Sequence, residues 1–142
     1  MKFWLSTAIL TVLALLSASC ADKIVSECDQ QVIIPGDDGE VTFSEIQNEV
    51  LTPSCALAGC HSGQFAAASL DLSVGNAYKN LVNVKSQEAP SLMLVSPNNS
   101  GQSYIVKKLK GDNTTVMPPG SALADAVIEV VVTWIDNGAK DN

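Results

Sequence analysis

Two cysteines and a histidine near the middle of the chain carry the clearest chemical signal: Cys55, Cys60 and His61. Two nearby thiols can each add across one vinyl group of a haem, and a histidine directly after the second thiol can reach the iron from the same side. The usual attachment spacing has two residues between the cysteines, whereas this chain has four. The longer bridge keeps the Cys-His adjacency that positions the ligand. Taken alone, the cysteine pair equally suits a small-loop disulfide in a secreted domain.

Other chemistry at these residues is harder to complete. His61 is the only histidine in the chain, so two cysteines and one histidine leave a four-ligand zinc shell incomplete unless Cys28 joins. A Ser/His/Asp type of hydrolytic site would have to recruit the same histidine. The chain also has no arginine, so a guanidinium fork for phosphate or carboxylate is missing. We therefore expect no enzyme active site here.

A short amphipathic helix is predicted just before the cysteine motif. Thr42 and Glu45 have capping-box spacing, and apolar residues follow at the helical intervals of Phe43, Ile46 and Val50. The pattern predicts that this helix stops at Pro53. It would deliver the chain straight into the motif.

The last segment gives the strongest helical pattern of the sequence. Ser121 is the predicted N-cap, Asp125 falls early in the helix, and Gly138 after Asn137 is the expected stop. Between them, apolar residues recur at Leu123, Val127, Val130, Val131, Trp134 and Ile135. We expect this stripe to pack against Phe43 and Ile46 of the first helix. Trp134, Tyr78 and Tyr104 are expected to line or close a ligand crevice, with plain core packing as the alternative.

Residues 62–120 have weak periodicity and are broken repeatedly by glycine and proline. Two short helices are predicted there, over 75–82 and 103–109. So long a loop region inside a compact domain normally signals function or a missing element. A bound cofactor that itself becomes the core would explain it.

Four sequence blocks follow one another in an order that resembles a known family. They are residues 59–63 (GCHSG), 70–73 (LDLS), 117–120 (MPPG) and 134–139 (WIDNGA). Together they resemble the single-haem c-type cytochrome domains of exported bacterial proteins, including the planctomycete-type domain, in which a C-x4-C-H variant occurs. The resemblance covers roughly residues 43–139. It implies an all-α, class I cytochrome c-like domain, in which N- and C-terminal helices pack around a haem and long loops intervene.

The resemblance also implies the ligands. Cys55 and Cys60 would bind one haem c covalently, and His61 would be the proximal iron ligand. A second histidine ligand is excluded because the chain has only one. The Pro-flanked Met117 matches the family's axial methionine, whereas Met93 has the surroundings of a core residue. His/Met ligation suits electron transfer. The alternative is that Met117 only packs and that the sixth position is open.

The N-terminus has the pattern of an export signal. Lys2 precedes an apolar stretch that includes residues 10–16, and residues 17–19 are small. We predict a signal peptide over 1–19, an N-terminal tether over 20–40 and the cytochrome domain over 41–142. Cys20 directly after the small residues resembles a lipoprotein signal, which would make it the lipidated first residue. Ordinary cleavage is the alternative, with Cys20 removed or paired with Cys28.

The charge of the mature chain argues against two classes of partner. With Lys2 removed, 7 lysines and 15 acidic residues give a formal charge of −8. Nucleic acid and anionic membrane surfaces both reward basic patches, so neither is an expected partner. A local basic cluster, Lys107, Lys108 and Lys110, would steer a redox partner or would simply be a solvated helix face.

These observations predict an electron carrier of the cell envelope, in the periplasm or anchored at the outer membrane through a lipid. Its partners would be redox proteins of the envelope, and it would not be an enzyme. Two alternatives remain: a disulfide-stapled lipoprotein module that binds a surface partner without haem, and a haem sensor or catalytic subunit with an open sixth site.

Overall fold

The computed structural model of the protein describes residues 40–142. The predicted signal peptide, Cys20, Cys28 and nearly all of the tether lie outside the described residues, so those predictions stay predictions. Within the part of the chain that the structure describes, no helix is both long enough and apolar enough to cross a bilayer.

The first helical segment runs from Phe43 to Ser54 in three registers. They are α1 (Phe43–Glu45), the π-helical η1 (Ile46–Leu51) and α2 (Thr52–Ser54). The predicted capping box is confirmed, because the Glu45 amide donates to Thr42 Oγ1 at 3.2 Å and the Thr42 amide donates to Glu45 Oε2 at 2.7 Å. The predicted stop at Pro53 is wrong by one residue. The hydrogen-bond register changes before Pro53 and leaves it in the first turn of α2, where a helix tolerates proline.

The middle of the chain is mostly loop, with short helices. These are η2 (Ala67–Ser69), α3 (Ala77–Leu81), η3 (Ser100–Gln102) and α4 (Tyr104–Lys110), of which η2 and η3 are 3-10 turns. The two helices predicted over 75–82 and 103–109 are confirmed as α3 and α4. Over residues 40–142 the backbone otherwise pairs only in isolated bridges, for example between Val82 and Val95. The predicted all-α class is therefore confirmed.

The last helix, α5 (Asp125–Asp136), begins later than the sequence predicted. Its N-cap is Ala124, whose extended backbone (ψ 145°) turns the chain into the helix, and Ser121 is exposed in the preceding loop. Ser121 is not used as a cap because the helix begins only after Ala124, three residues further along the chain. The predicted stop is confirmed: the helix gives way at Asn137, and Gly138 has a φ of +101° that suits glycine.

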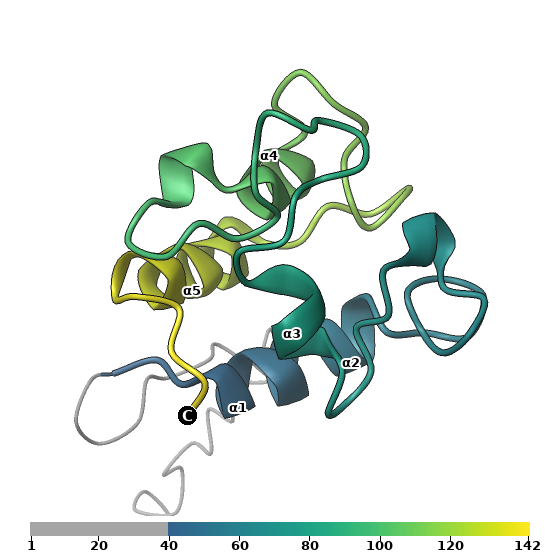
Figure 1. The fold of residues 1–142 in the computed structure, drawn as a ribbon, viewed down its shortest axis with the longest axis horizontal. Coiled ribbons are helices and arrows are strands. Elements are labelled where there is room, and N and C mark those ends of the chain that lie inside the picture. The colour runs from purple at the N-terminus through teal and green to yellow at the C-terminus, as the bar shows by residue number, and fades with distance from the viewer. Residues whose placement is uncertain (1–39) are drawn as a thin grey trace, which may run out of the picture. The chain divides into compact units, whose positions relative to one another are not determined.

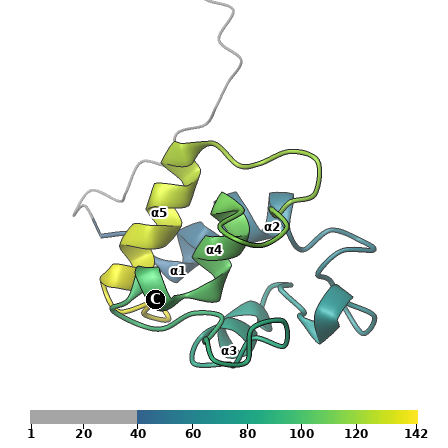
Figure 2. The ribbon, with the colours of Figure 1, turned by 90° about the horizontal axis from the view of Figure 1, so that it is seen from above.

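The first and last helical segments pack together, as predicted. The Phe43 and Trp134 rings lie 5.4 Å apart, and Trp134 is 1% exposed, with its indole N–H donating to the Lys140 carbonyl at 3.0 Å. The C-terminus adds a second link, because the Asn142 carbonyl accepts from the Ser44 amide at 3.0 Å. Figures 1 and 2 show α5 beside both α4 and this first segment. The helices thereby form a frame, and the loops attach to it.

One loop stands apart from that frame. The chain between α2 and α3, which carries η2, extends away from the helices in both views (Figures 1 and 2). It contains Cys60 and His61. The residues with the strongest chemical signal therefore lie where the loop leaves the helical frame.

Candidate functional site

An apolar cavity of about 290 Å³ lies within the helical frame. This volume is at the lower end of the range of small-molecule sites, which are usually concave and mostly apolar. The side chains that give it this character come from η1, the middle of the chain, α4 and α5; they are Ile46, Val50, Leu51, Leu72, Leu81, Leu94, Ile105, Leu109, Val131 and Trp134.

Three of the predicted site residues meet at this cavity. Cys55, His61 and Met117 all line it, although they come from the end of α2, the loop after it and the loop before α5. Met93 does not line it, and its backbone instead bridges to Lys85 and Ser103. The structure thus separates the two methionines, because Met117 lines the cavity and Met93 does not.

Cys60 is placed differently from Cys55. It is exposed and does not belong to the cavity lining, although it directly precedes His61. Backbone bonds fold the bridge between the cysteines into a closed turn: the His61 amide donates to the Cys55 carbonyl at 3.1 Å, and the Cys60 amide donates to Leu57 at 2.9 Å. Gly59, with a φ of +81°, takes a backbone conformation that this turn requires. Four intervening residues therefore still bring the two ends of the motif together.

The His61 ring is held in one tautomer. Its Nδ1 lies 3.1 Å from the Ala67 carbonyl, and a carbonyl can only accept, so Nδ1 carries the proton. The lone pair of Nε2 is then left for a ligand. Metal-binding histidines are typically oriented in this way, with the second ring nitrogen donating to a carbonyl or carboxylate.

Asp71 clamps the loop that carries His61. Its Oδ1 accepts from the Gly63 amide at 3.1 Å and from the Ser73 amide at 3.0 Å, as well as from the Ser73 hydroxyl, and Oδ2 accepts from Asn76 Nδ2 at 2.8 Å. These bonds, led by that of the Ser73 hydroxyl, lower the pKa of Asp71 to about 2. The next residue continues the clamp, since the Leu72 amide donates to the His61 carbonyl at 2.9 Å.

Sequence reasoning missed this function of Asp71. The block of residues 70–73 entered only as part of a family resemblance. An aspartate followed two residues later by serine and five residues later by asparagine is a local turn signal that could have indicated it.

The Cys55 thiol is protonated in the cavity wall. Burial raises its pKa to about 11, and the nearby Cys60 contributes to the same shift. Both cysteines are free thiols in the structure, so the two are not joined by a disulfide. Within residues 40–142, no three His, Cys, Asp or Glu side chains gather as a metal-binding cluster.

The aromatic predictions are only partly confirmed. Trp134 and Tyr104 line the cavity, and Ile46 of the first helical segment lines it with them. Tyr78 does not; it packs edge-on against Phe43 at 5.1 Å, and its hydroxyl donates to the Ala139 carbonyl at 3.0 Å. Core packing, which was the alternative for these aromatic residues, therefore applies to Tyr78. The turn after α5 provides the acceptor for its hydroxyl, and this acceptor lies away from the cavity.

The lysine cluster of α4 is not a uniform solvated face. Lys107, Lys108 and Lys110 each form an ion pair, with Asp112, Glu88 and Glu129 respectively. Lys108 also lines the cavity, together with the polar run of residues 85–88. The sequence had indicated no function for that run, whose four polar residues interrupt a predominantly apolar cavity wall.

The burial of Cys55 predicts unequal thiol reactivity. A thiol with a pKa near 11 is ionised to roughly one part in a thousand at about pH 8, against about a quarter for an ordinary thiol. In haem-free protein, iodoacetamide should therefore alkylate Cys55 at least about 100-fold more slowly in native buffer than in denaturant. Cys60 should react readily in both. Single Cys55→Ser and Cys60→Ser variants assign the two rates by mass spectrometry, and equal native rates would contradict the burial of Cys55.

The low pKa of Asp71 predicts a contribution to acid stability. A carboxyl whose pKa falls on folding stabilises the folded state above its unfolded pKa, near 3.8, and that contribution is lost as the pH drops toward about 2. Asp71→Asn should flatten the decline of the unfolding midpoint between these two values. Asp112→Asn, an exchange outside the His61 loop, is the matched control. The unfolding midpoint is measured by chemical denaturation. If it falls with pH as steeply in Asp71→Asn as in wild type, the ionised Asp71 carboxylate does not stabilise the fold.

Comparison with known proteins adds no identification. The chain matches no protein-family model, no curated protein and no solved structure. The resemblance to c-type cytochrome domains therefore stays a prediction from the motifs of the sequence.

Proposed function

We propose that this protein is an electron carrier with one covalently attached c-type haem in the bacterial cell envelope. One observation carries the proposal: Cys55 and His61 of one motif, the latter with a free Nε2, line the same apolar cavity as Met117, which is distant in sequence. That donor set fits a haem, which requires thiols for attachment, an imidazole and a thioether for the iron, and apolar walls for the macrocycle.

Attachment would use both cysteines. Each S–H adds across one vinyl group, so that sulfur bonds to one vinyl carbon, hydrogen goes to the other, and no atom is lost. Cys55 would bind from the cavity wall and Cys60 from the adjoining loop. The raised pKa of Cys55 means that its proton must be removed before the thiolate can react.

The iron would be held between His61 and Met117. The Ala67 carbonyl binds Nδ1 of the imidazole, so Nε2 would be the ligand. Met117 is fixed through its backbone, because its amide donates to the Lys108 carbonyl of α4 at 2.8 Å. A haem held by His61 and Met117 would supply one-electron chemistry at a raised potential. This favours a carrier over an enzyme that activates oxygen.

The same reasoning extends to fold and location. First and last helical segments that pack together, with loops around a central cavity, are compatible with the class I cytochrome c-like arrangement that we propose. The export signal and Cys20 support an envelope location, with the chain either free in the periplasm or lipid-anchored at the outer membrane. Its partners would then be other redox proteins of the envelope.

Covalent haem is the first outcome to measure. Expressed in a host with c-type haem maturation, the wild-type chain should give a pyridine haemochrome spectrum of the c type. The tryptic peptide that contains residues 55–61 should have the mass of the peptide plus one intact haem. Cys55→Ala with Cys60→Ala should abolish the adduct. A wild-type peptide that lacks haem and has lost two hydrogens would indicate the disulfide-stapled module instead, provided that the loss persists in Cys28→Ala, because this tryptic peptide also contains Cys28.

Met117 is the residue that separates a carrier from an open-site haem protein. In haem-loaded protein, Met117→Ala should remove the low-spin, methionine-ligated spectrum and lower the reduction potential. Met93→Ala is the matched control and should leave both unchanged, because Met93 does not line the cavity. A spectrum that Met117→Ala does not alter would reject Met117 as ligand and favour a sensor or a catalytic subunit.

A further inference from the structure

The Lys and Glu side chains in the cavity lining gather on two segments of the chain. Lys85 and Glu88 belong to the loop after α3, and Lys108 belongs to α4. The rest of the lining is predominantly apolar. A ligand that fills this cavity would therefore meet apolar walls and ionic groups at different places, which suits a molecule with an apolar body and charged substituents.

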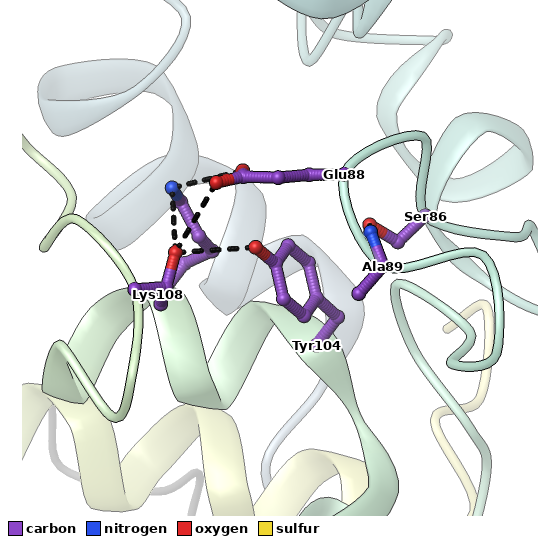
Figure 3. Close-up of polar contacts among 6 residues, drawn as sticks. Ser86, Glu88, Ala89, Tyr104 and Lys108 are labelled. Carbon is purple, nitrogen blue, oxygen red and sulfur yellow. Dashed lines mark hydrogen bonds and ion pairs between the residues drawn. The ribbon is translucent and has the colours of Figure 1, made fainter.

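Lys108 is the most deeply placed of these charges. Its side chain is 14% exposed, and Nζ donates to Glu88 Oε2 at 3.1 Å and to Thr114 Oγ1 at 3.1 Å. The Thr114 hydroxyl in turn lies 3.1 Å from the Tyr104 hydroxyl and 3.3 Å from Glu88 Oε1, and Figure 3 shows Glu88 reaching across to this group. A largely buried ammonium group needs an anion and further acceptors, and these contacts supply them.

Glu88 is the movable member of the pair. Its side chain is 59% exposed, and it reaches Lys108 from a loop, so it can turn into water without uncovering a core. A second carboxylate at the same place would take over its contacts with Lys108 and Thr114. A ligand carboxylate and the Glu88 carboxylate would therefore compete for the same site at Lys108.

Lys85 adds a cation that has no such competitor. It lines the cavity and is exposed, and among residues 40–142 it has no carboxylate within ion-pair distance. The cavity lining thus carries two lysines and one glutamate, in a chain whose formal net charge is −7. A local positive balance in an acidic protein favours an anionic group on the ligand.

We propose that Lys108 and Lys85 bind the carboxylates of the cavity ligand and that Glu88 competes with the ligand for Lys108. The inference rests on the proposed function, in which these carboxylates are the two propionates of the haem. Ser86, which also lines the cavity, stabilises the turn that presents Glu88, since its hydroxyl accepts from the Ala89 amide at 3.0 Å (Figure 3). Glu88 then tunes how firmly the propionates are held.

The test uses full-length, haem-loaded protein and the propionate bending band in its resonance Raman spectrum, which shifts with hydrogen bonding to a propionate. Lys108→Met should shift the band in the direction of weaker bonding. Glu88→Gln should shift it in the opposite direction, because the competitor has lost its charge. Lys110→Met is the matched control: Lys110 lies on the same helix and pairs with Glu129 at 3.2 Å, but it does not line the cavity. The propionate band of Lys110→Met should stay at the wild-type position.

The outcomes separate this inference from the proposed function. Wild-type protein that takes up no haem in the maturation host overturns both. Haem-loaded wild type with an unmoved band in Lys108→Met overturns the carboxylate site alone, and an equal shift in Lys110→Met does the same, because the effect would then be general. Should Lys108→Met fail to fold, Glu88→Gln decides: an opposite shift supports the competition, and an unmoved band rejects it.

Discussion

The contact between Phe43 and Trp134 is the constraint on which the rest of this structure depends. These two rings join the first helical segment to the last, and the cavity lies against Trp134 and the residues after Phe43 on the same segment. Because Trp134 is fully buried and its N–H is bonded, its position is determined on every side. The apolar walls from η1 and α5 are then held at a fixed separation. The loops that carry the polar chemistry need only close the remaining sides.

The loop with His61 is ordered by hydrogen bonds rather than by apolar burial. Its backbone carbonyls and amides form hydrogen bonds with Cys55, Ala67 and Leu72. The Asp71 carboxylate accepts hydrogen bonds from the Gly63 and Ser73 amides. This allows a largely exposed segment to present one imidazole nitrogen in a defined direction. A segment held in this way can tolerate changes at its surface while the ligand direction is kept. The same logic explains why a longer bridge between the two cysteines does not displace the histidine: the bridge is a turn closed on itself.

The sequence was informative wherever a local pattern determines the outcome. The capping box at Thr42 and the apolar stripe of the last helix could both be predicted from residue type and spacing, whereas the distinction between Met117 and Met93 came with the family resemblance. It was misleading where tertiary context decides. Ser121 is a good capping residue, but the helix begins only after Ala124, and Pro53 is tolerated because the helix changes register before it. The position of Tyr78 and the burial of Lys108 depend on partners 61 and 20 residues away, Ala139 and Glu88, which no local pattern can indicate.

The modest size of the cavity has a consequence for how a ligand is retained. A site of about 290 Å³ gives a large flat molecule less apolar contact than a deep pocket would. Under the proposed function, two thioether bonds keep the haem attached, so its rebinding to the cavity is intramolecular. A short covalent tether corresponds to an effective ligand concentration on the order of millimolar or above. The walls then do not have to enclose the ligand to keep it. A protein freed from that requirement can leave one side of its cofactor at the surface, where a passing partner can approach it closely and leave again quickly.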